Sequence, residues 1–261
     1  MTAGPHAGRA ALVTGASAGI GAACVRAFAG GGWRVVFCAR RQPAIEKLAQ
    51  EIRAAGGEAH GFVLDVRDAS AVEQAIAQLP PEWRDIDVLV NNAGLSRGLD
   101  PLQKGLLSDW NEMIDTNVKG LLHVTRAVVP GMIERGRGHV INLGSIAGRE
   151  VYPKGNVYCA SKHAVDAITR GLRMDLLGTG VRVSTVDPGL VNTEFSAVRF
   201  HGDRARADAA YQGMTPLSAA DVADVILWIA SQPAHRVIAE VLLYPADQAS
   251  ARDVHRKPAQ P

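Results

Sequence analysis

The chain has 261 residues, 47% of them hydrophobic and 21% charged, and this composition excludes disordered, collagen-like and coiled-coil proteins. Its formal net charge of +2 is too small to indicate a nucleic-acid partner or an anionic membrane surface. The three cysteines, Cys24, Cys38 and Cys159, have neither C-x-x-C spacing nor a nearby histidine at a ligand interval, which argues against a disulfide framework and against a metal site.

Short apolar runs rich in Val, Ile and Leu alternate along the chain with longer segments of helical period. This alternation predicts repeated βαβ units and a parallel sheet that is buried on both faces. We expect one α/β domain over residues 8–248, a Rossmann-type doubly wound parallel sheet of about seven strands with helices on both faces, followed by a tail over 249–261. The expected strands are 10–13, 34–38, 59–64, 88–90, 138–143, 182–186 and 241–244.

A glycine-rich turn directly follows the first expected strand, and a helical pattern follows the turn. Gly15 allows a sharp exit from the strand, Gly19 has no Cβ to hold a pyrophosphate away, and Gly21 lets the helix lie close to the sheet. The helix N-terminus then faces the phosphates. The spacing is G-x-x-x-G-x-G rather than G-x-G-x-x-G, and a simple tight turn remains the alternative. The order strand, glycine turn, helix favours a nucleotide site that includes Ser17 and Ile20.

The end of the second expected strand indicates the type of nucleotide. An NAD site generally places an acidic residue here for the ribose 2′-hydroxyl, whereas a 2′-phosphate requires arginine. The chain has Arg40 and Arg41 at this point, and two guanidinium groups can bind a phosphate through charge-assisted hydrogen bonds. NADP is therefore favoured over NAD. The alternative interpretation is that both arginines are solvated and bind no phosphate.

The third and fourth expected strands also end in residues suited to a cofactor groove. Asp65 and Val66 close the third strand, and Asn91 is followed by Asn92, Ala93 and Gly94 at the end of the fourth. The carboxyl ends of parallel strands lie on the edge of the sheet where ligands bind. Ordinary turn residues are an equally reasonable interpretation of these positions in isolation.

Four polar residues farther along the chain suggest proton transfer. Tyr158 and Lys162 are four apart in a helical stretch and so share one helix face. A neighbouring ammonium group lowers the pKa of a tyrosine by favouring the phenolate. Ser145 follows the fifth strand and can hold a substrate oxygen within reach of Tyr158, while Asn117 lies inside a long helical segment, where asparagine is a poor choice unless its polarity is used. By itself, Y-x-x-x-K also describes an ordinary helix face.

The segment 189–216 has no clean period and follows a strand. An excursion of this length at the carboxyl end of a strand is often a lid, so we expect a substrate lid near 189–216 rather than a surface insertion.

From Gly15 to about Gln248 the chain resembles the short-chain dehydrogenase/reductase family. The glycine turn, residues 91–94, Asn117, Ser145, the Tyr158-x-x-x-Lys162 pair and Pro188-Gly189 occur in the family's order and approximate spacing. The resemblance implies that Tyr158 gives or takes the substrate proton, Lys162 lowers the pKa of Tyr158 and binds the nicotinamide ribose, Ser145 positions the substrate oxygen, and Asn117 supports a water-mediated proton relay.

The same resemblance implies which residues border the cofactor: 188–193 the nicotinamide, 65–66 the adenine, and 91–94 the adenosine ribose. The predicted NADP-binding residues are Gly15, Ser17, Gly19, Ile20, Gly21, Arg40, Arg41, Asp65, Val66, Asn92, Ala93, Gly94, Tyr158, Lys162, Pro188, Gly189, Val191 and Thr193.

A narrower resemblance is to the NADP-dependent 3-hydroxy acid dehydrogenases, a branch that includes serine and L-allo-threonine dehydrogenases and malonic semialdehyde reductases. Residues 79–83, 189–200, 202–203 and 233–235 carry it. It implies interconversion of the hydroxyl and carbonyl of a small 3-hydroxy acid, and a homotetramer. For the substrate carboxylate we consider Arg199, with Arg149 or Lys154 as alternatives, so the predicted substrate contacts are Ser145, Tyr158 and Arg199.

Two other functions stay open at this point. The same scaffold serves reductases of larger ketoacyl, sugar or secondary-metabolite carbonyls, and it can also serve a non-catalytic NADP-binding sensor. The chain shows neither a secretory signal nor an apolar run near the roughly 18 residues that cross a bilayer, so we expect a cytoplasmic protein with a small-molecule substrate and with neither a membrane nor a nucleic-acid partner.

Overall fold

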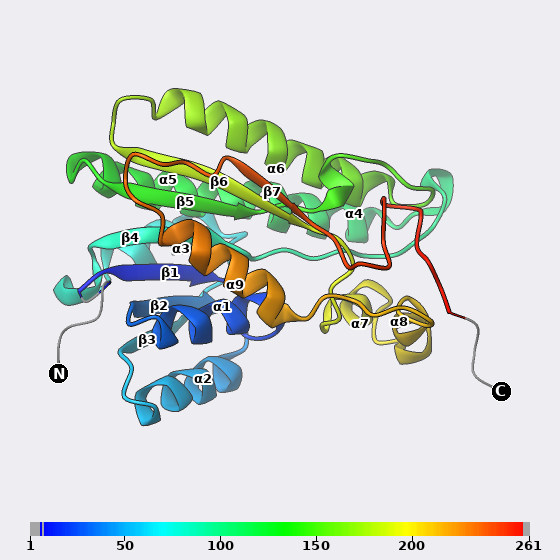
Figure 1. Ribbon diagram of the computed structural model, residues 1–261, viewed down its shortest axis with the longest axis horizontal. Coiled ribbons are helices and arrows are strands. Elements are labelled where there is room, and N and C mark those ends of the chain that lie inside the picture. Colours follow the sequence, from blue (N-terminus) through cyan, green and yellow to red (C-terminus); the bar gives the residue numbers. More distant parts are fainter. Residues whose placement is uncertain (1–5, 7, 258–261) are drawn as a thin grey trace.

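Seven parallel strands form one sheet in the order β3-β2-β1-β4-β5-β6-β7 (Figure 1). The computed structural model of the chain describes His6 and residues 8–257. The strands are β1 (Ala10–Thr14), β2 (Arg34–Ala39), β3 (Ala59–Val63), β4 (Ile86–Asn91), β5 (Gly138–Leu143), β6 (Val181–Pro188) and β7 (Glu240–Leu243). The predicted doubly wound Rossmann-type sheet is confirmed.

Helices cover both faces of this sheet (Figure 1). They are α1 (Gly19–Gly30), α2 (Gln42–Ala54), α3 (Ala69–Ala77), α4 (Leu107–Ile114), α5 (Leu121–Glu134), α6 (Asn156–Asp175), α7 (Phe195–Arg199), α8 (Arg204–Ala209) and α9 (Ala219–Ala230). Short 3₁₀ turns occur at Pro81–Trp83, Leu102–Lys104 and Ile146–Gly148, and a π-helical turn spans Asp115–Gly120.

Two hydrophobic cores result from the alternation of side chains along the strands. Val13 of β1 packs with Phe28 and Ile226 on the face covered by α1, α2 and α9. Its neighbour Leu12 packs with Met132 on the face covered by α3 and α5. Successive strand residues point to opposite faces, so a strand buried on both sides reads as a continuous apolar run.

Two strands, β4 and β6, extend beyond their expected ranges through buried carboxylates, at which the apolar runs of the sequence stop. β4 begins two residues before the expected Val88 and includes Asp87, whose carboxylate accepts hydrogen bonds from the backbone N–H of Ala10 at 3.0 Å and from Arg137 Nε at 2.9 Å. β6 continues through Asp187, which accepts from Arg149 at 2.7 Å. These partners compensate the desolvation of each carboxylate and allow it inside a sheet.

The segment predicted as a lid contains α7 and α8, and the chain end lies against it. The backbone N–H of Lys257 donates to the carbonyl of Gly213 at 2.7 Å, and Arg256 Nη2 donates to the carbonyl of Ala210 at 3.0 Å. Figure 1 shows this C-terminal stretch descending beside α8. The last part of the predicted tail, 258–261, lies outside the described residues.

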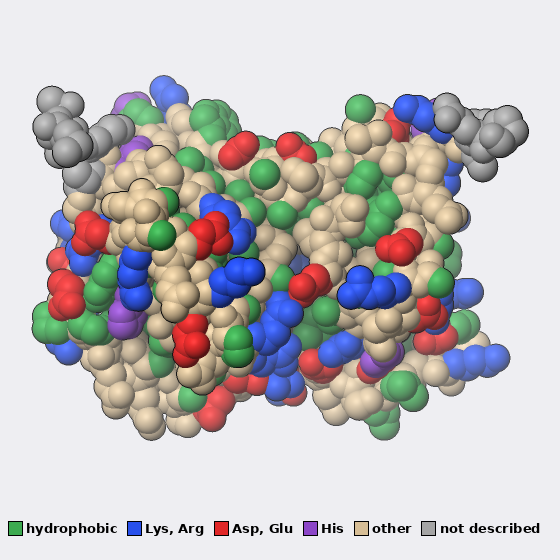
Figure 2. Space-filling view, turned by 90° about the horizontal axis from the view of Figure 1, so that it is seen from below, with side chains coloured by type: hydrophobic (Ala, Val, Ile, Leu, Met, Phe, Trp, Pro, Cys, Tyr) green, Lys and Arg blue, Asp and Glu red, His purple; other side chains and the backbone are tan. Residues whose placement is uncertain are grey.

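The molecular surface mixes charges of both signs. Figure 2 shows basic and acidic side chains intermingled on the face that it presents, in keeping with a net charge of +2. Within residues 8–257, no helix is both long enough and apolar enough to cross a membrane.

Candidate active site

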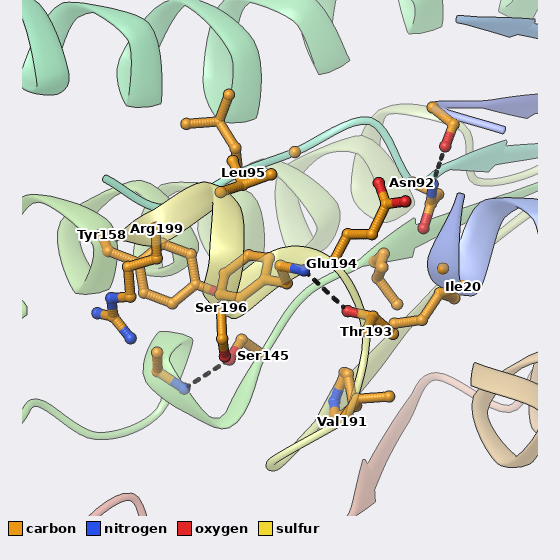
Figure 3. Close-up of a pocket in the computed structure, with 18 of the residues that line it drawn as sticks. Ile20, Asn92, Leu95, Ser145, Tyr158, Val191, Thr193, Glu194, Ser196 and Arg199 are labelled. Carbon is orange, nitrogen blue, oxygen red and sulfur yellow. Dashed lines mark hydrogen bonds between the residues drawn. The ribbon is translucent and has the colours of Figure 1, made fainter. Parts of the chain in front are cut away.

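A pocket of about 610 Å³ runs along the carboxyl edge of the sheet, from the glycine turn after β1 to Tyr158 on α6 (Figure 3). The strand order reverses between β1 and β4, and in open α/β sheets ligands bind at this switch point. The pocket lining includes nearly all of the predicted cofactor residues: Gly15, Ser17, Gly19, Ile20, Arg40, Arg41, Asp65, Val66, Asn92, Ala93, Gly94, Tyr158, Lys162, Pro188, Gly189, Val191 and Thr193.

The glycine turn is shaped as a cradle for phosphate. Gly15 and Gly19 have φ of +69° and +53°, a region that favours glycine. A Cβ on Gly15 would lie 2.8 Å from Ala93 Cα, and one on Gly21 would lie 2.5 Å from the Gly15 carbonyl oxygen, so Gly21 serves close packing behind the pocket. Helix α1 starts after Ala18, whose side chain cannot cap the helix, and its first N–H groups are left for an anionic ligand.

The backbone at the end of β4 is tied to this turn. The Thr14 hydroxyl accepts hydrogen bonds from the N–H groups of Asn92 and Ala93 at 3.1 and 3.0 Å. The Asn92 carboxamide donates to the Thr14 carbonyl at 2.8 Å, so it fixes the turn as well as lining the pocket. Asn91 is buried and donates to Thr125 and to Asn142, which makes it part of the sheet's interior.

Charged residues surround the far end of the pocket, beyond the glycine turn. Arg41 Nε donates to Ser17 Oγ at 3.2 Å, and Arg40 approaches the carboxylate of Glu112 at 3.7 Å. The guanidinium of Arg67 holds the Asp65 carboxylate through two nitrogens and keeps the pKa of Asp65 below its usual value.

At the opposite end, Ser145, Tyr158 and Lys162 line one stretch of the pocket. Ser145 lies two residues after β5 and caps a 3₁₀ turn, its Oγ accepting from the N–H of Ala147 at 3.1 Å. Tyr158 and Lys162 lie one turn apart on α6, and Lys162 Nζ donates to the carbonyl of Leu143 at 2.8 Å. Three of the residues predicted for proton transfer, Ser145, Tyr158 and Lys162, thus lie together on one wall of the pocket.

Burial controls the protonation of this wall. It raises the pKa of Tyr158, against the opposing effects of Ser145 and Arg199, so Tyr158 is a protonated phenol at neutral pH. Burial also lowers the pKa of Lys162 to about 8, which the charge of Asp187 partly offsets. Lys162 is not among the groups that shift the pKa of Tyr158 here, so its expected effect on the phenol stays a prediction.

Asn117 lies behind the pocket rather than in its lining. It belongs to the π-helical turn between α4 and α5, a feature that the helical period does not reveal and that is frequent at functional sites. Its carboxamide accepts from the N–H of Leu95 and donates to the carbonyl of Leu95, both at 2.8 Å, and also donates to Ser161 Oγ at 3.0 Å. Asn117 therefore fixes the backbone next to Gly94, and its role in a proton relay stays a prediction.

Of the three cations considered for a substrate carboxylate, Arg199 alone lines this pocket. Arg149 is paired with Asp187 and Glu240, which removes it as a substrate ligand, and Lys154 lies at a separate small hollow. The guanidinium carbon of Arg199 is 5.5 Å from the ring centroid of Tyr158, and its Nη2 donates to the Tyr152 hydroxyl at 2.5 Å. Figure 3 shows Arg199 beside Tyr158.

Several lining residues were missed by the sequence reasoning. They include Leu95, Arg97, Tyr152, Phe195 and Gln248. Phe195 packs edge-on against Tyr158 with ring centroids 5.6 Å apart, and Gln248 accepts a hydrogen bond from the Leu190 N–H at 2.8 Å. Leu95 directly follows the predicted Gly94, but no pattern in the sequence marks the others.

The pKa of Lys162 predicts a pH dependence of stability. Because its folded-state pKa of about 8 is below the ordinary 10.5, the unfolded chain binds more protons between these values, and stability rises with pH in that window. The difference in free energy of unfolding between the wild type and Lys162→Met, measured in urea from pH 7.5 to 10.5, should shift in favour of the wild type as pH rises. A difference independent of pH would contradict the buried, depressed lysine.

Comparisons with known proteins agree with this geometry. Residues 9–203 match the short chain dehydrogenase family. The chain is 48% identical over 247 residues to the NADP-dependent 3-hydroxy acid dehydrogenase YdfG of Salmonella typhi, covering 94% of this chain and 98% of that protein. It is 47% identical to sulfoacetaldehyde reductase 2 of Chromohalobacter salexigens, covering 91% and 94%, and 43% identical to serine 3-dehydrogenase of Agrobacterium fabrum, covering 92% and 95%.

A solved structure described as the closed form of serine dehydrogenase complexed with NADP⁺ superimposes with a TM-score of 0.90 at 46% identity, covering 95% of this chain and all of that one. The chain belongs to the short-chain dehydrogenase/reductase family of oxidoreductases.

Proposed function

We propose that the protein is an NADP-dependent dehydrogenase that interconverts the hydroxyl and carbonyl groups of a small 3-hydroxy acid. The observation that carries this proposal is the position of Arg199, whose guanidinium lies over the Tyr158 ring at the end of a pocket that begins at a phosphate cradle. The relatives named for 3-hydroxy acids, serine and sulfoacetaldehyde support it, because each of these substrates is small and carries an acidic group.

The residues present fit NADP. The first N–H groups of α1 and the backbone of the glycine turn at Gly15 and Gly19 suit its pyrophosphate, and Arg40 and Arg41 suit its 2′-phosphate. The remaining predicted contacts line the groove from Asp65 to Thr193. When bound, the nicotinamide supplies the hydride acceptor or donor.

The chain's own residues then handle the proton and the alignment. Ser145 and Tyr158 hold the substrate oxygen, and Tyr158 takes the hydroxyl proton in oxidation or donates it in reduction. Lys162 places an ammonium on the same wall, one helical turn from Tyr158. Fixing these groups on β5 and α6 supplies orientation, which is the protein's main contribution to such a reaction.

Arg199 is the proposed ligand of the substrate carboxylate. Tyr152 and the Gly98 carbonyl hold its guanidinium, at 2.5 and 3.2 Å, so its orientation is set before an acid arrives. A sulfonate carries the same charge, and the relative named sulfoacetaldehyde reductase makes a sulfonate aldehyde the second candidate substrate.

We further propose that residues 189–216 act as a substrate lid and that 249–257, the described part of the tail, braces it. Arg97 donates to the Val198 carbonyl at 2.5 Å and the Gly98 N–H donates to the Arg199 carbonyl at 2.9 Å, which join α7 to the opposite wall. The bonds of Arg256 and Lys257 to 210–213 hold the other end.

The proposed assembly is a homotetramer in the cytoplasm. Large apolar side chains are exposed on and after the outer helices, among them Ile133 on α5, Met174 on α6 and Leu177, and burial by a second copy would stabilise them. The three cysteines are free and buried, as suits a reducing compartment.

The proposed reaction is tested by absorbance at the nicotinamide band. Purified protein is mixed with NADP or NAD and, in turn, L-serine, L-allo-threonine, 3-hydroxypropionate, 3-hydroxyisobutyrate and isethionate. We expect reduction of NADP with at least one of the 3-hydroxy acids, and slower reduction of NAD. Reduction with isethionate alone would favour the sulfonate substrate, and turnover only of larger carbonyls would overturn the 3-hydroxy acid.

In the same assay Tyr158→Phe should lower kcat by about 10²–10⁴-fold, the usual range for loss of a general acid–base group. Its Kd for NADPH, measured by fluorescence, should stay near the wild-type value. Tyr244→Phe, which also removes a phenolic hydroxyl, is the control and should retain turnover. Normal activity of Tyr158→Phe would remove Tyr158 from the proposed role.

Arg199→Gln should raise KM for the acid substrate by about 10–100-fold, since a hydrogen bond to a charged group contributes about 1.5–3 kcal/mol. The methyl ester of the same acid is the matched neutral substrate, and its KM should change much less. Equal loss with acid and ester would show that Arg199 supports the lid without binding the carboxylate.

The tetramer is tested by light scattering coupled to gel filtration. The expected mass is four times the 27.6 kDa of one chain. A mass of one chain at micromolar concentration would contradict the proposed assembly.

A further inference from the structure

One of the two arginines proposed for the 2′-phosphate is already paired with a carboxylate from the lid. Arg41 Nη2 lies 2.9 Å from Glu194 Oε2, while the same guanidinium donates to the hydroxyl and the carbonyl of Ser17, both at 3.2 Å. Glu194 is the residue before α7, and its side chain makes no capping hydrogen bond to that helix. Both Arg41 and Glu194 also line the pocket.

The position of Glu194 is fixed by its neighbour. Thr193 approaches the glycine turn so closely that a Cβ on Gly19 would lie 3.3 Å from Thr193 Cβ. In Figure 3, Thr193 and Glu194 lie toward Ile20 and Asn92, while Arg199 at the other end of the same segment lies beside Tyr158. The lid therefore holds one carboxylate at the phosphate end and one guanidinium at the proton-transfer end.

Arg40 has a different environment. Its carboxylate neighbour, Glu112, is on α4 and binds Arg97 at 2.7 Å, so Arg40 contacts it only at 3.7 Å. Glu112 is thus neutralised by another arginine and stays with the body of the domain. Among the described residues, Glu194 forms an ion pair with Arg41 and belongs to the proposed lid segment.

From these contacts we propose that Glu194 is an intramolecular competitor of the NADP 2′-phosphate for Arg41. The inference rests on the proposed use of NADP. A phosphate that carries nearly two negative charges and the Glu194 carboxylate repel each other, so they cannot both bind Arg41 at full strength. NAD has a hydroxyl at this position and leaves the Arg41–Glu194 pair intact. Glu194 thereby weakens NADP binding, leaves NAD binding unchanged, and takes the phosphate's place when NADP leaves.

The size of the effect follows from exposure. Arg41 and Glu194 side chains are 52% and 59% exposed, and ion pairs between exposed side chains contribute little because water and salt screen them. We therefore expect Glu194→Gln to tighten NADPH binding by about 2–5-fold, within the range of exposed ion pairs, and to leave NADH binding unchanged. The tightening should shrink as salt rises from 0.05 to 0.5 M.

A double-mutant cycle tests the proposal through binding constants. Kd values for NADPH and NADH are measured by fluorescence titration for the wild type, Glu194→Gln, Arg41→Ala and the double variant. The Glu194→Gln effect should disappear in the Arg41→Ala background, because the competition needs the guanidinium. Glu58→Gln is the matched control: Glu58 also pairs with an arginine, Arg34 at 3.3 Å, but at the opposite edge of the sheet, and its loss should not change either Kd.

The outcomes separate the two proposals. Failure of the wild type to bind NADPH would overturn the proposed function itself. If the wild type binds NADPH and Glu194→Gln binds it more weakly, Glu194 orients Arg41 for the phosphate. If the Kd of Glu194→Gln for NADPH is unchanged, Glu194 does not affect phosphate binding at Arg41. Either result overturns the proposed competition. An equal gain for NADPH and NADH would also overturn it, since it would trace the effect to the lid in general.

Discussion

The close approach of the glycine turn to the end of β4 is the constraint on which the rest of the pocket depends. Gly15 lies so near Ala93 that no side chain fits between them, and the Thr14 hydroxyl holds the two following N–H groups of the neighbouring strand. This contact closes the floor of the groove at the switch in strand order. A ligand laid across it necessarily extends from the N-terminus of α1 toward β5 and α6.

Buried charges support the opposite wall. Asp187 at the end of β6 is compensated by Arg149 and by the Thr185 hydroxyl, and a side chain at Gly144 would collide with its carboxylate. Desolvation lowers the pKa of Lys162, and the negative charge of Asp187 opposes this decrease by stabilising the ammonium form. Asp187 and Arg149 thus support the polar groups of the wall without lining the pocket, and the wall is preorganised before a substrate binds.

Much of this arrangement can be predicted from sequence because its signals are local. Val- and Ile-rich runs mark buried parallel strands, and the residues that follow them necessarily share one edge of the sheet. The failures have specific physical causes. The helical period of the sequence continues through the π turn and so hides the position of Asn117. Arg149 and Arg199 cannot be told apart as substrate ligands from the sequence, because they differ only in their partners in the fold, Asp187 for Arg149 and Tyr152 for Arg199. Gln248 follows β7 at the carboxyl edge of the sheet and lines the pocket through its contact with the Leu190 N–H, which no local pattern in the sequence marks.

A crystal structure of the protein with NADP and a 3-hydroxy acid bound would test the proposed function most directly. We expect pyrophosphate at the N-terminus of α1, the 2′-phosphate at Arg40 and Arg41, and the substrate oxygen between Ser145 and Tyr158 with its carboxylate at Arg199. A dinucleotide bound in the reverse direction, or an acid whose hydroxyl lies away from Tyr158, would contradict it.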